Sequence, residues 1–297
     1  MQNVTHFVSA YIGKMQKGCS SMLKKIITAL GVFLFAAAGA ISASASEYPI
    51  DMRLNGEYLY TDVRPFIENG STLAPVRFIS EALHAQVEWD QNTQTALIYS
   101  GNTTVEIPVG KSYAYINGKK QRLATPAQLI EGRALLPVRF LAEALDFNVA
   151  WDDQYRNVEI SKDGVTPPES LIDPAYSHDE LVWLSRIIYA ESRGESFLGQ
   201  VAVGDVILNR VESDQFPDDI YSVIFDRRYG VQFEPILNGS IYNDPLKTNI
   251  GAAKTALRNP SVVGSSLYFF NPATAQSTWI SKNRPYFTTI GNHQFHL

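Results

Sequence analysis

A segment that occurs twice limits the architecture of this chain more than any other feature. Residues 75–90 read PVRFISEALHAQVEWD and residues 137–152 read PVRFLAEALDFNVAWD, so every identity lies 62 positions apart. The same spacing relates further matches, and residues 50–100 and 112–162 align without a gap. Self-similarity at a fixed period predicts two copies of one small structural unit.

Each copy combines a hairpin signal with a short helix. Asn55-Gly56 and Asn117-Gly118 stand between short β-prone runs, as in two-residue hairpin turns. In the first helix Phe78, Ala82 and Leu83 follow helical spacing and are expected to face inward. The predicted elements are helices at Val76–Leu83 and Val138–Leu145 and strands at Ala96–Tyr99 and Asn157–Ser161.

Matched arginines and tryptophans in the two copies allow a structural or a ligand-binding interpretation. Arg77 and Arg139 each precede a glutamate by four residues, Glu81 and Glu143, which favours ion pairs along the helix surface over ligand contacts. The equivalent tryptophans at positions 89 and 151 are expected to be apolar anchors of the core rather than sugar platforms.

The repeated motif L-[AL]-P-V-R-F-[IL]-x-E-A-L, followed by V-x-W-D, resembles the copper amine oxidase N-terminal-like, or stalk, domain of secreted bacterial proteins over about residues 50–162. The resemblance implies a small α+β domain without chemistry of its own. His84 is the only histidine of this region, whereas copper sites use several imidazoles or thiolates, so no copper is expected.

The first 45 residues have the pattern of an export signal. Lys24 and Lys25 precede the uncharged apolar run Ile26–Ala38, and Ala43-Ser44-Ala45 supplies a small-x-small cleavage site. The run is shorter than the roughly 20 residues of a membrane span. We expect a cleaved signal peptide, a start at Met22 with residues 1–21 as an upstream extension, and a product that is secreted or held in the cell wall or spore envelope.

Charge and cysteine usage exclude several classes of function. The leading 45 residues hold four lysines and no acid, which leaves 21 basic against 30 acidic residues, a net charge of −9. An acidic protein is poorly suited to phosphate contacts, so no nucleic-acid partner is expected. The single cysteine, Cys19, lies in the leading segment, so the mature chain is expected to contain no disulfide, thiolate zinc site or cysteine nucleophile. The sequence does not indicate an oligomeric state.

A second domain is expected at 178–297, after a stalk domain at 46–162 and a linker at 163–177 that holds three prolines. Ser177 and Glu180 form a capping-box pattern that begins a helix, and Gly194 ends it. Within this helix Glu191 follows Leu184 by seven residues, about two turns, so its side chain continues the apolar face.

Two explanations for an acid on that face remain open. One is a buried ion pair with Arg186, Arg193 or Arg210. The other is a cleft acid whose pKa desolvation raises, so that it donates a proton near neutral pH. Glu195, beyond the helix end, is the second acid candidate, and Asp205 and Glu234 are weaker ones.

The segments IYAESRGESFLGQVAVGDVILNRV, FNPATAQSTWI and IGNHQF resemble the cell wall hydrolase family of spore cortex-lytic enzymes over about residues 178–297. The resemblance implies a lysozyme-like α+β catalytic domain that cleaves peptidoglycan between N-acetylmuramic acid and N-acetylglucosamine, typically as a lytic transglycosylase. The catalytic glutamate of the family is the first acid of A-E-x-R-G-E, which is Glu191 here.

A single acid is sufficient for that reaction, because the 6-hydroxyl of the muramic acid closes an anhydro ring, whereas ordinary glycosidases use two carboxylates. We find no second acid at an obvious partner spacing, which favours the transglycosylase over hydrolysis. A wall-binding protein without activity is the alternative, and a zinc amidase is disfavoured because the histidines form no ligand pattern. We therefore expect no metal and no cofactor.

Several aromatic and polar residues are candidates for sugar contacts, with core packing as the competing interpretation. In the family a Gln-Phe pair occupies the stretch around position 232, but here Glu234-Pro235 follows it, so this loop departs from the pattern. The candidate substrate-binding residues are Gln232, Phe233, Tyr268, Phe270, Asn271 and Trp279.

Overall fold

The computed structural model describes residues 48–228 and 230–297. The predicted signal peptide and its cleavage site lie outside these residues. Within the described part of the chain, no helix combines the length and apolar character needed to cross a bilayer.

The stalk domain is built from elements that recur at the spacing of the sequence repeat. The first segment forms β1 (Asp51–Leu54), β2 (Glu57–Leu59), β3 (Phe66–Glu68), β4 (Ser71–Pro75), α3 (Val76–Ala82), β5 (Gln86–Asp90) and β6 (Thr95–Ser100). After β7 (Thr103–Pro108) come β8 (Tyr113–Ile116), β9 (Lys119–Arg122), β10 (Gln128–Ile130), β11 (Arg133–Pro137), α4 (Val138–Ala144), β12 (Asn148–Asp152) and β13 (Asn157–Ser161). Each element of the first segment has a counterpart that begins 62 residues later. The two predicted helices and the two predicted strands are confirmed to within one residue at each end.

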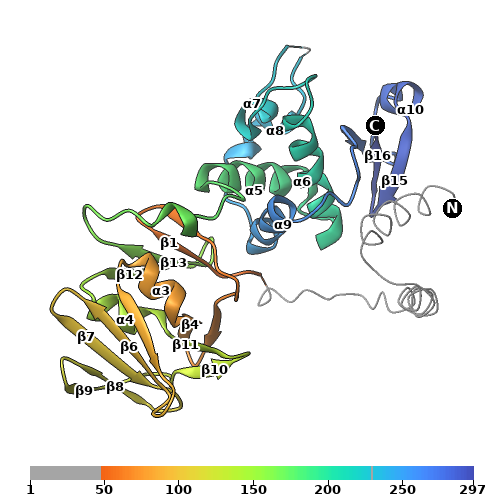
Figure 1. Cartoon of the computed structure of the whole chain (residues 1–297). Coiled ribbons are helices and arrows are strands. Elements are labelled where there is room, and N and C mark those ends of the chain that lie inside the picture. Colours follow the sequence, from red (N-terminus) through yellow and green to blue (C-terminus); the bar gives the residue numbers. More distant parts are fainter. Residues whose placement is uncertain (1–47, 229) are drawn as a thin grey trace, which may run out of the picture. The chain divides into compact units, whose positions relative to one another are not determined.

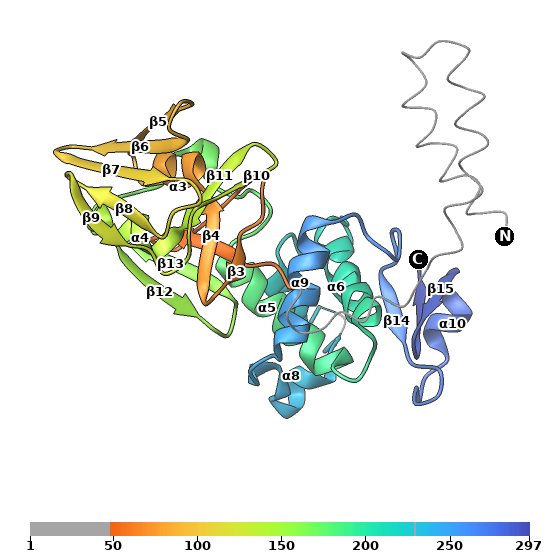
Figure 2. The same ribbon diagram turned by 90° about the horizontal axis from the view of Figure 1, so that it is seen from below.

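The sheets combine strands from both segments, as Figures 1 and 2 show. One sheet has the order β12-β13-β1-β2, with β1 parallel to β13, and a second has the order β5-β6-β7-β8-β9. In the third, β10-β11-β4-β3, Leu73 faces Pro137 and Pro75 faces Leu135, a register that is symmetric about the 62-residue offset. Because every sheet needs both segments, they share one hydrophobic core.

Backbone geometry explains the two Asn-Gly pairs. Asn55 and Gly56 have φ angles of 48° and 96°, and Asn117 and Gly118 have 50° and 75°. Two consecutive positive φ angles are what a tight turn between antiparallel strands requires, and asparagine and glycine adopt them most readily. The predicted hairpins β1–β2 and β8–β9 are confirmed.

The second domain has a helical body and a small antiparallel sheet. Its elements are α5 (His178–Ser192), α6 (Phe197–Val211), α7 (Ile220–Ile224), α8 (Glu234–Asn238), η3 (Ser240–Tyr242), α9 (Lys247–Arg258), β14 (Tyr268–Phe270), α10 (Trp279–Asn283), β15 (Tyr286–Ile290) and β16 (His293–His296). The sheet has the order β14-β16-β15. The α+β class expected for the whole chain is confirmed.

Close packing of α5, α6 and α9 fixes the helical body (Figure 1). A Cβ atom at Gly204 of α6 would lie 2.9 Å from Ile188 of α5 and 3.2 Å from Ala256 of α9. The absence of a side chain at this position therefore lets the three helices pack closely.

The segment 163–177 connects the two domains along the edge strand β2. It contains the short helix η2 (Glu169–Leu171), and the Tyr60 amide donates to the Leu171 carbonyl at 2.9 Å. The Asp173 amide donates to the Tyr58 carbonyl at 2.8 Å. Its backbone is therefore hydrogen-bonded to β2 despite the three prolines.

Candidate active site

Glu191 lies near the C-terminal end of helix α5, at the surface of the second domain. The Ser177 hydroxyl accepts from the Glu180 amide and the Glu180 carboxylate accepts from the Ser177 amide, so the predicted capping box is present. Leu184, Ile187 and Ile188 are fully buried on the inward face. Glu191, on the last turn, is half-buried.

A pocket of about 540 Å³ lies at this end of the helix. It is formed where the α5–α6 turn faces β14 and β16. Its lining consists of Ala190, Glu191, Ser192, Arg193, Gly194, Glu195, Phe269, Phe270, Asn271, Thr274 and His293. The sequence candidates Glu191, Glu195, Phe270 and Asn271 are thus brought together around one space.

The Glu191 carboxyl is placed to hold a proton near neutral pH. Burial, with a smaller contribution from the negative charge of Glu234, raises the pKa of Glu191 to about 7, although Arg210 opposes the shift. Within residues 48–228 and 230–297, the Glu191 carboxylate has no ion-pair or hydrogen-bond partner. The predicted alternative, a buried ion pair with Arg186, Arg193 or Arg210, is not formed.

Arg210 lies near this acid but is held by other groups. Its Nε donates to the Leu267 carbonyl at 2.8 Å, and its guanidinium lies 4.8 Å from the Phe216 ring centre and 5.2 Å from that of Phe233. Burial lowers the pKa of Arg210 to about 10, so the group stays charged at neutral pH. Arg210 therefore limits the rise in the Glu191 pKa without neutralising the carboxyl.

Glu195 has a different environment in the same pocket. Its Oε2 accepts from the Asn292 amide at 3.0 Å, and its Oε1 accepts from the Asn292 side chain at 2.9 Å. Burial works to raise the pKa of Glu195, but the hydrogen bonds from Asn292 and the nearby His293 outweigh it and hold this pKa below its usual value. Glu195 is therefore an ionised acceptor that ties the α5–α6 turn to the β15–β16 hairpin.

Among the pocket residues that the sequence did not single out, His293 and Thr274 come from distant parts of the chain. His293 lies on β16 with Nδ1 3.8 Å from the Glu195 carboxylate, and burial lowers its pKa despite that neighbour. Thr274 belongs to the turn after β14, in which Asn271 Oδ1 accepts from the Ala273 amide. Both residues are about 80 or more positions from Glu191, so no local pattern in the sequence connects them to it.

The remaining sequence candidates lie outside the pocket lining. Phe233 is buried in the core of the second domain, and the Gln232 side chain donates to the Gly230 carbonyl. Tyr268 packs edge-on against the half-exposed Trp279, with ring centres 6.1 Å apart. The Arg284 guanidinium lies against both rings, 4.4 Å from the Tyr268 ring centre and 5.4 Å from that of Trp279.

The two weaker acid candidates have separate roles. Burial raises the pKa of Asp205 to about 6, against a hydrogen bond that its carboxylate accepts from the Val262 amide at 2.6 Å, and the residue does not line the pocket. Glu234, at the start of α8, acts on Glu191 through its charge.

Two parts of the chain match models of known protein families. Residues 53–160 match the family model described as copper amine oxidase N-terminal domain, and residues 194–296 match that described as cell wall hydrolase. The second match begins just after α5, so the role of Glu191 depends on the geometry given above.

The similar proteins are spore cortex-lytic enzymes. That of Bacillus cereus is 41% identical over 132 residues, 43% of this chain and 49% of the relative, and that of Bacillus subtilis is 38% identical over 120 residues, 40% of this chain and 38% of the relative. The chain thus spans about half or less of the length of these curated relatives. The solved catalytic domain of the germination-specific lytic transglycosylase SleB from Bacillus anthracis is 41% identical, with a TM-score of 0.39, and is matched over 100% of its length by 42% of this chain.

The two family matches and the curated relatives lead to the same assignment. The chain joins a segment that matches the copper amine oxidase N-terminal domain to a segment that matches the cell wall hydrolase family.

Proposed function

We propose that this protein cleaves the glycan strands of peptidoglycan as a lytic transglycosylase, with Glu191 as the acid and then the base. The observation that carries the proposal is an unpaired carboxyl in a pocket, with a pKa raised to about 7. The names of the spore cortex-lytic relatives and of the SleB catalytic domain support it.

The reaction needs one proton carrier. Protonated Glu191 gives its proton to the oxygen between C1 of N-acetylmuramic acid and C4 of N-acetylglucosamine, and the C1–O bond breaks. The Glu191 carboxylate then removes the proton of the muramic acid 6-hydroxyl, whose oxygen bonds to C1 and closes a 1,6-anhydro ring. The glutamic acid is restored and no water is consumed.

The other pocket residues support this cycle. Glu195 remains ionised while Glu191 is protonated, so the two acids in one pocket are separated in pKa, as in enzymes that assign different roles to two carboxyls. The negative charge of Glu195 favours the positive charge that develops at C1. Phe270 and Asn271 provide an apolar wall and an amide for the sugar.

Product mass distinguishes this proposal from its competitors. Purified peptidoglycan is digested with the full chain, and the soluble fragments are analysed by mass spectrometry. We expect anhydro-muramic ends, each about 18 Da lighter than a hydrolytic end. Products with hydrated reducing ends would replace the transglycosylase by a hydrolase, and wall binding without soluble products would favour the wall-binding alternative.

The rate is expected to fall as the pH rises through about 7. Glu191 must be protonated to act as the acid, and its protonated fraction declines above its pKa. Removing the charge of Glu234 by Glu234→Gln is expected to lower the Glu191 pKa and move the alkaline limb of the profile to lower pH. Rates of fragment release measured between pH 5 and 9 check this, and an unmoved limb in Glu234→Gln would show that Glu234 does not act on the acid.

A further inference from the structure

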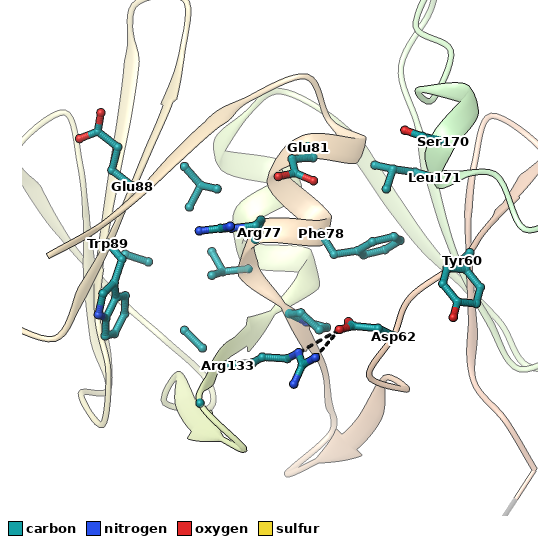
Figure 3. Close-up of a pocket in the computed structure, with 16 residues that line it drawn as sticks. Tyr60, Asp62, Arg77, Phe78, Glu81, Glu88, Trp89, Arg133, Ser170 and Leu171 are labelled. Atoms are coloured by element: carbon teal, nitrogen blue, oxygen red, sulfur yellow. Dashed lines mark hydrogen bonds and ion pairs between the residues drawn. The ribbon is translucent and has the colours of Figure 1, made fainter. Parts of the chain in front are cut away.

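The stalk domain contains two equivalent grooves. Groove 1, about 650 Å³, is lined among others by Arg77, Phe78, Glu81 and Trp89 (Figure 3). Groove 2, about 500 Å³, is lined at the same positions 62 residues later by Arg139, Phe140, Glu143 and Trp151. A hairpin from the other segment completes each groove. The β10–β11 hairpin contributes Gly132 to groove 1, and the β3–β4 hairpin contributes Gly70 to groove 2.

One wall of each groove is a tryptophan ring whose orientation is held by a side-chain hydrogen bond. Trp89 Nε1 donates to the Gln91 side chain at 2.8 Å, and Trp151 Nε1 donates to the Asp153 side chain at 3.4 Å. Both tryptophans pack against the hydrophobic core, as the sequence predicts. They are only partly buried, so part of each ring remains exposed to solvent. A ring whose polar edge is fixed by a neighbour offers a preorganised apolar face.

The opposite wall of each groove is a helix that carries an arginine. Helix α3 contributes Arg77 to groove 1, and helix α4 contributes Arg139 to groove 2. Arg77 is exposed and has no ion-pair or hydrogen-bond partner among the described residues, so its predicted pair with Glu81 is not formed. Arg139 does form the predicted pair with Glu143, at 3.3 Å, and it also donates to the Val149 carbonyl at 2.6 Å. In Figure 3, Arg77 points from α3 toward the strand that bears Trp89, while Phe78 points the other way.

Positive and negative side chains are nearly balanced in both grooves. Groove 1 adds Arg133, paired with Asp62, and Glu88 to the residues already named, and groove 2 adds Arg122. Such a mixed field gives no strong net attraction to a densely charged polyanion or polycation. A ligand rich in hydroxyl and amide groups, with at most one charge in each repeating unit, would find donors, acceptors and an apolar surface in one place.

We propose that grooves 1 and 2 bind the N-acetylated glycan strand of peptidoglycan, a sugar ring lying on the indole and its hydroxyl and acetamido groups meeting the arginine and the glutamate. Two sites with the same side chains match a polymer that repeats the same disaccharide. This inference rests on the proposed function, since that function makes the glycan strand the ligand available to the chain. Two contacts on one strand or wall raise the apparent affinity beyond that of either groove.

Binding and cleavage can be tested separately. The full chain carrying Glu191→Gln is incubated with insoluble peptidoglycan and with glycan strands from which the peptides have been removed, and free protein is measured. The test variant adds Arg77→Ala and Arg139→Ala, and the matched control adds Lys111→Ala and Lys119→Ala, two exposed lysines of the same domain outside both grooves. Thermal unfolding of all variants is recorded, and Trp89→Ala provides a second test that leaves every charge in place.

The proposal predicts about a tenfold or greater loss of affinity for both ligands in the arginine double variant and a smaller loss in Trp89→Ala, with the lysine control unchanged. Equal binding by the arginine and lysine variants would overturn it. Loss of binding to the intact wall but not to peptide-free strands would overturn it in favour of peptide recognition. Soluble fragments from the chain with Glu191 intact report on the proposed function, so failure of cleavage and failure of the grooves are distinguishable.

Discussion

Replacing Glu191 by glutamine is expected to lower the release of soluble fragments from peptidoglycan by about a thousandfold, since a positioned acid contributes roughly 10²–10⁴ in rate. Glutamine keeps the size and polarity of the side chain but carries no proton that it can donate and later recover. Because Glu191 has no partner in the described structure, the substitution removes no ion pair or hydrogen bond. The measurement is the initial rate of turbidity loss, with fragment mass as confirmation.

Two matched variants make the result specific. Glu212→Gln changes an exposed glutamate of the same domain outside the pocket and is expected to keep the normal rate. Glu195→Gln is expected to lower the rate less than Glu191→Gln does. The ionised Glu195 carboxylate accepts hydrogen bonds from Asn292 and carries no proton to donate to the substrate. Fragment release by Glu191→Gln at the wild-type rate would remove Glu191 from the mechanism.

Replacing Asp51 by alanine is expected to lower the free energy of unfolding by about 3–5 kcal/mol, the usual cost of removing one member of a buried ion pair. The Asp51 carboxylate lies 2.8 Å from the Lys254 ammonium and 3.1 Å from the Arg258 guanidinium, and it accepts from the Tyr176 hydroxyl at 2.9 Å. Lys254 is 1% exposed. The variant would leave this ammonium without a carboxylate partner.

Chemical denaturation of the full chain measures the effect. The control is Asp62→Ala, which removes an ion pair with Arg133 in which both side chains are about half exposed. Exposed pairs contribute about 0–1 kcal/mol, so this variant is expected to unfold close to the wild-type midpoint. Equal destabilisation by the two variants would mean that the Asp51 cluster, which links β1 to α9, adds nothing beyond an ordinary surface pair.

Local patterns in the sequence predict much of this fold because they describe contacts between near neighbours. The Asn-Gly pairs determine their hairpins through backbone conformation, and Ser177 with Glu180 determines the start of α5. Helical spacing also places Glu191 on the inward side of α5, which is what desolvates it. These features need no knowledge of distant residues.

Features that depend on long-range contacts were not accessible in the same way. Nothing local indicates that β1 pairs with β13 or that Lys254 meets Asp51 across the two domains. The pocket likewise gains His293 from the last strand. The spacing of Arg77 and Glu81 predicts a pair that does not form, since exposed pairs at this spacing are worth only a few tenths of a kcal/mol and other orientations compete.

The titration of the Glu191 carboxyl tests the central claim most directly. Carbon-13 labelling of the glutamate side chains allows their carboxyl signals to be followed by NMR from about pH 3 to 9, and Glu191→Gln identifies the signal of interest. We predict that this signal titrates at about pH 7. A midpoint near 4.5, the ordinary value for a glutamate, would contradict the account, because Glu191 would then carry no proton to donate at neutral pH.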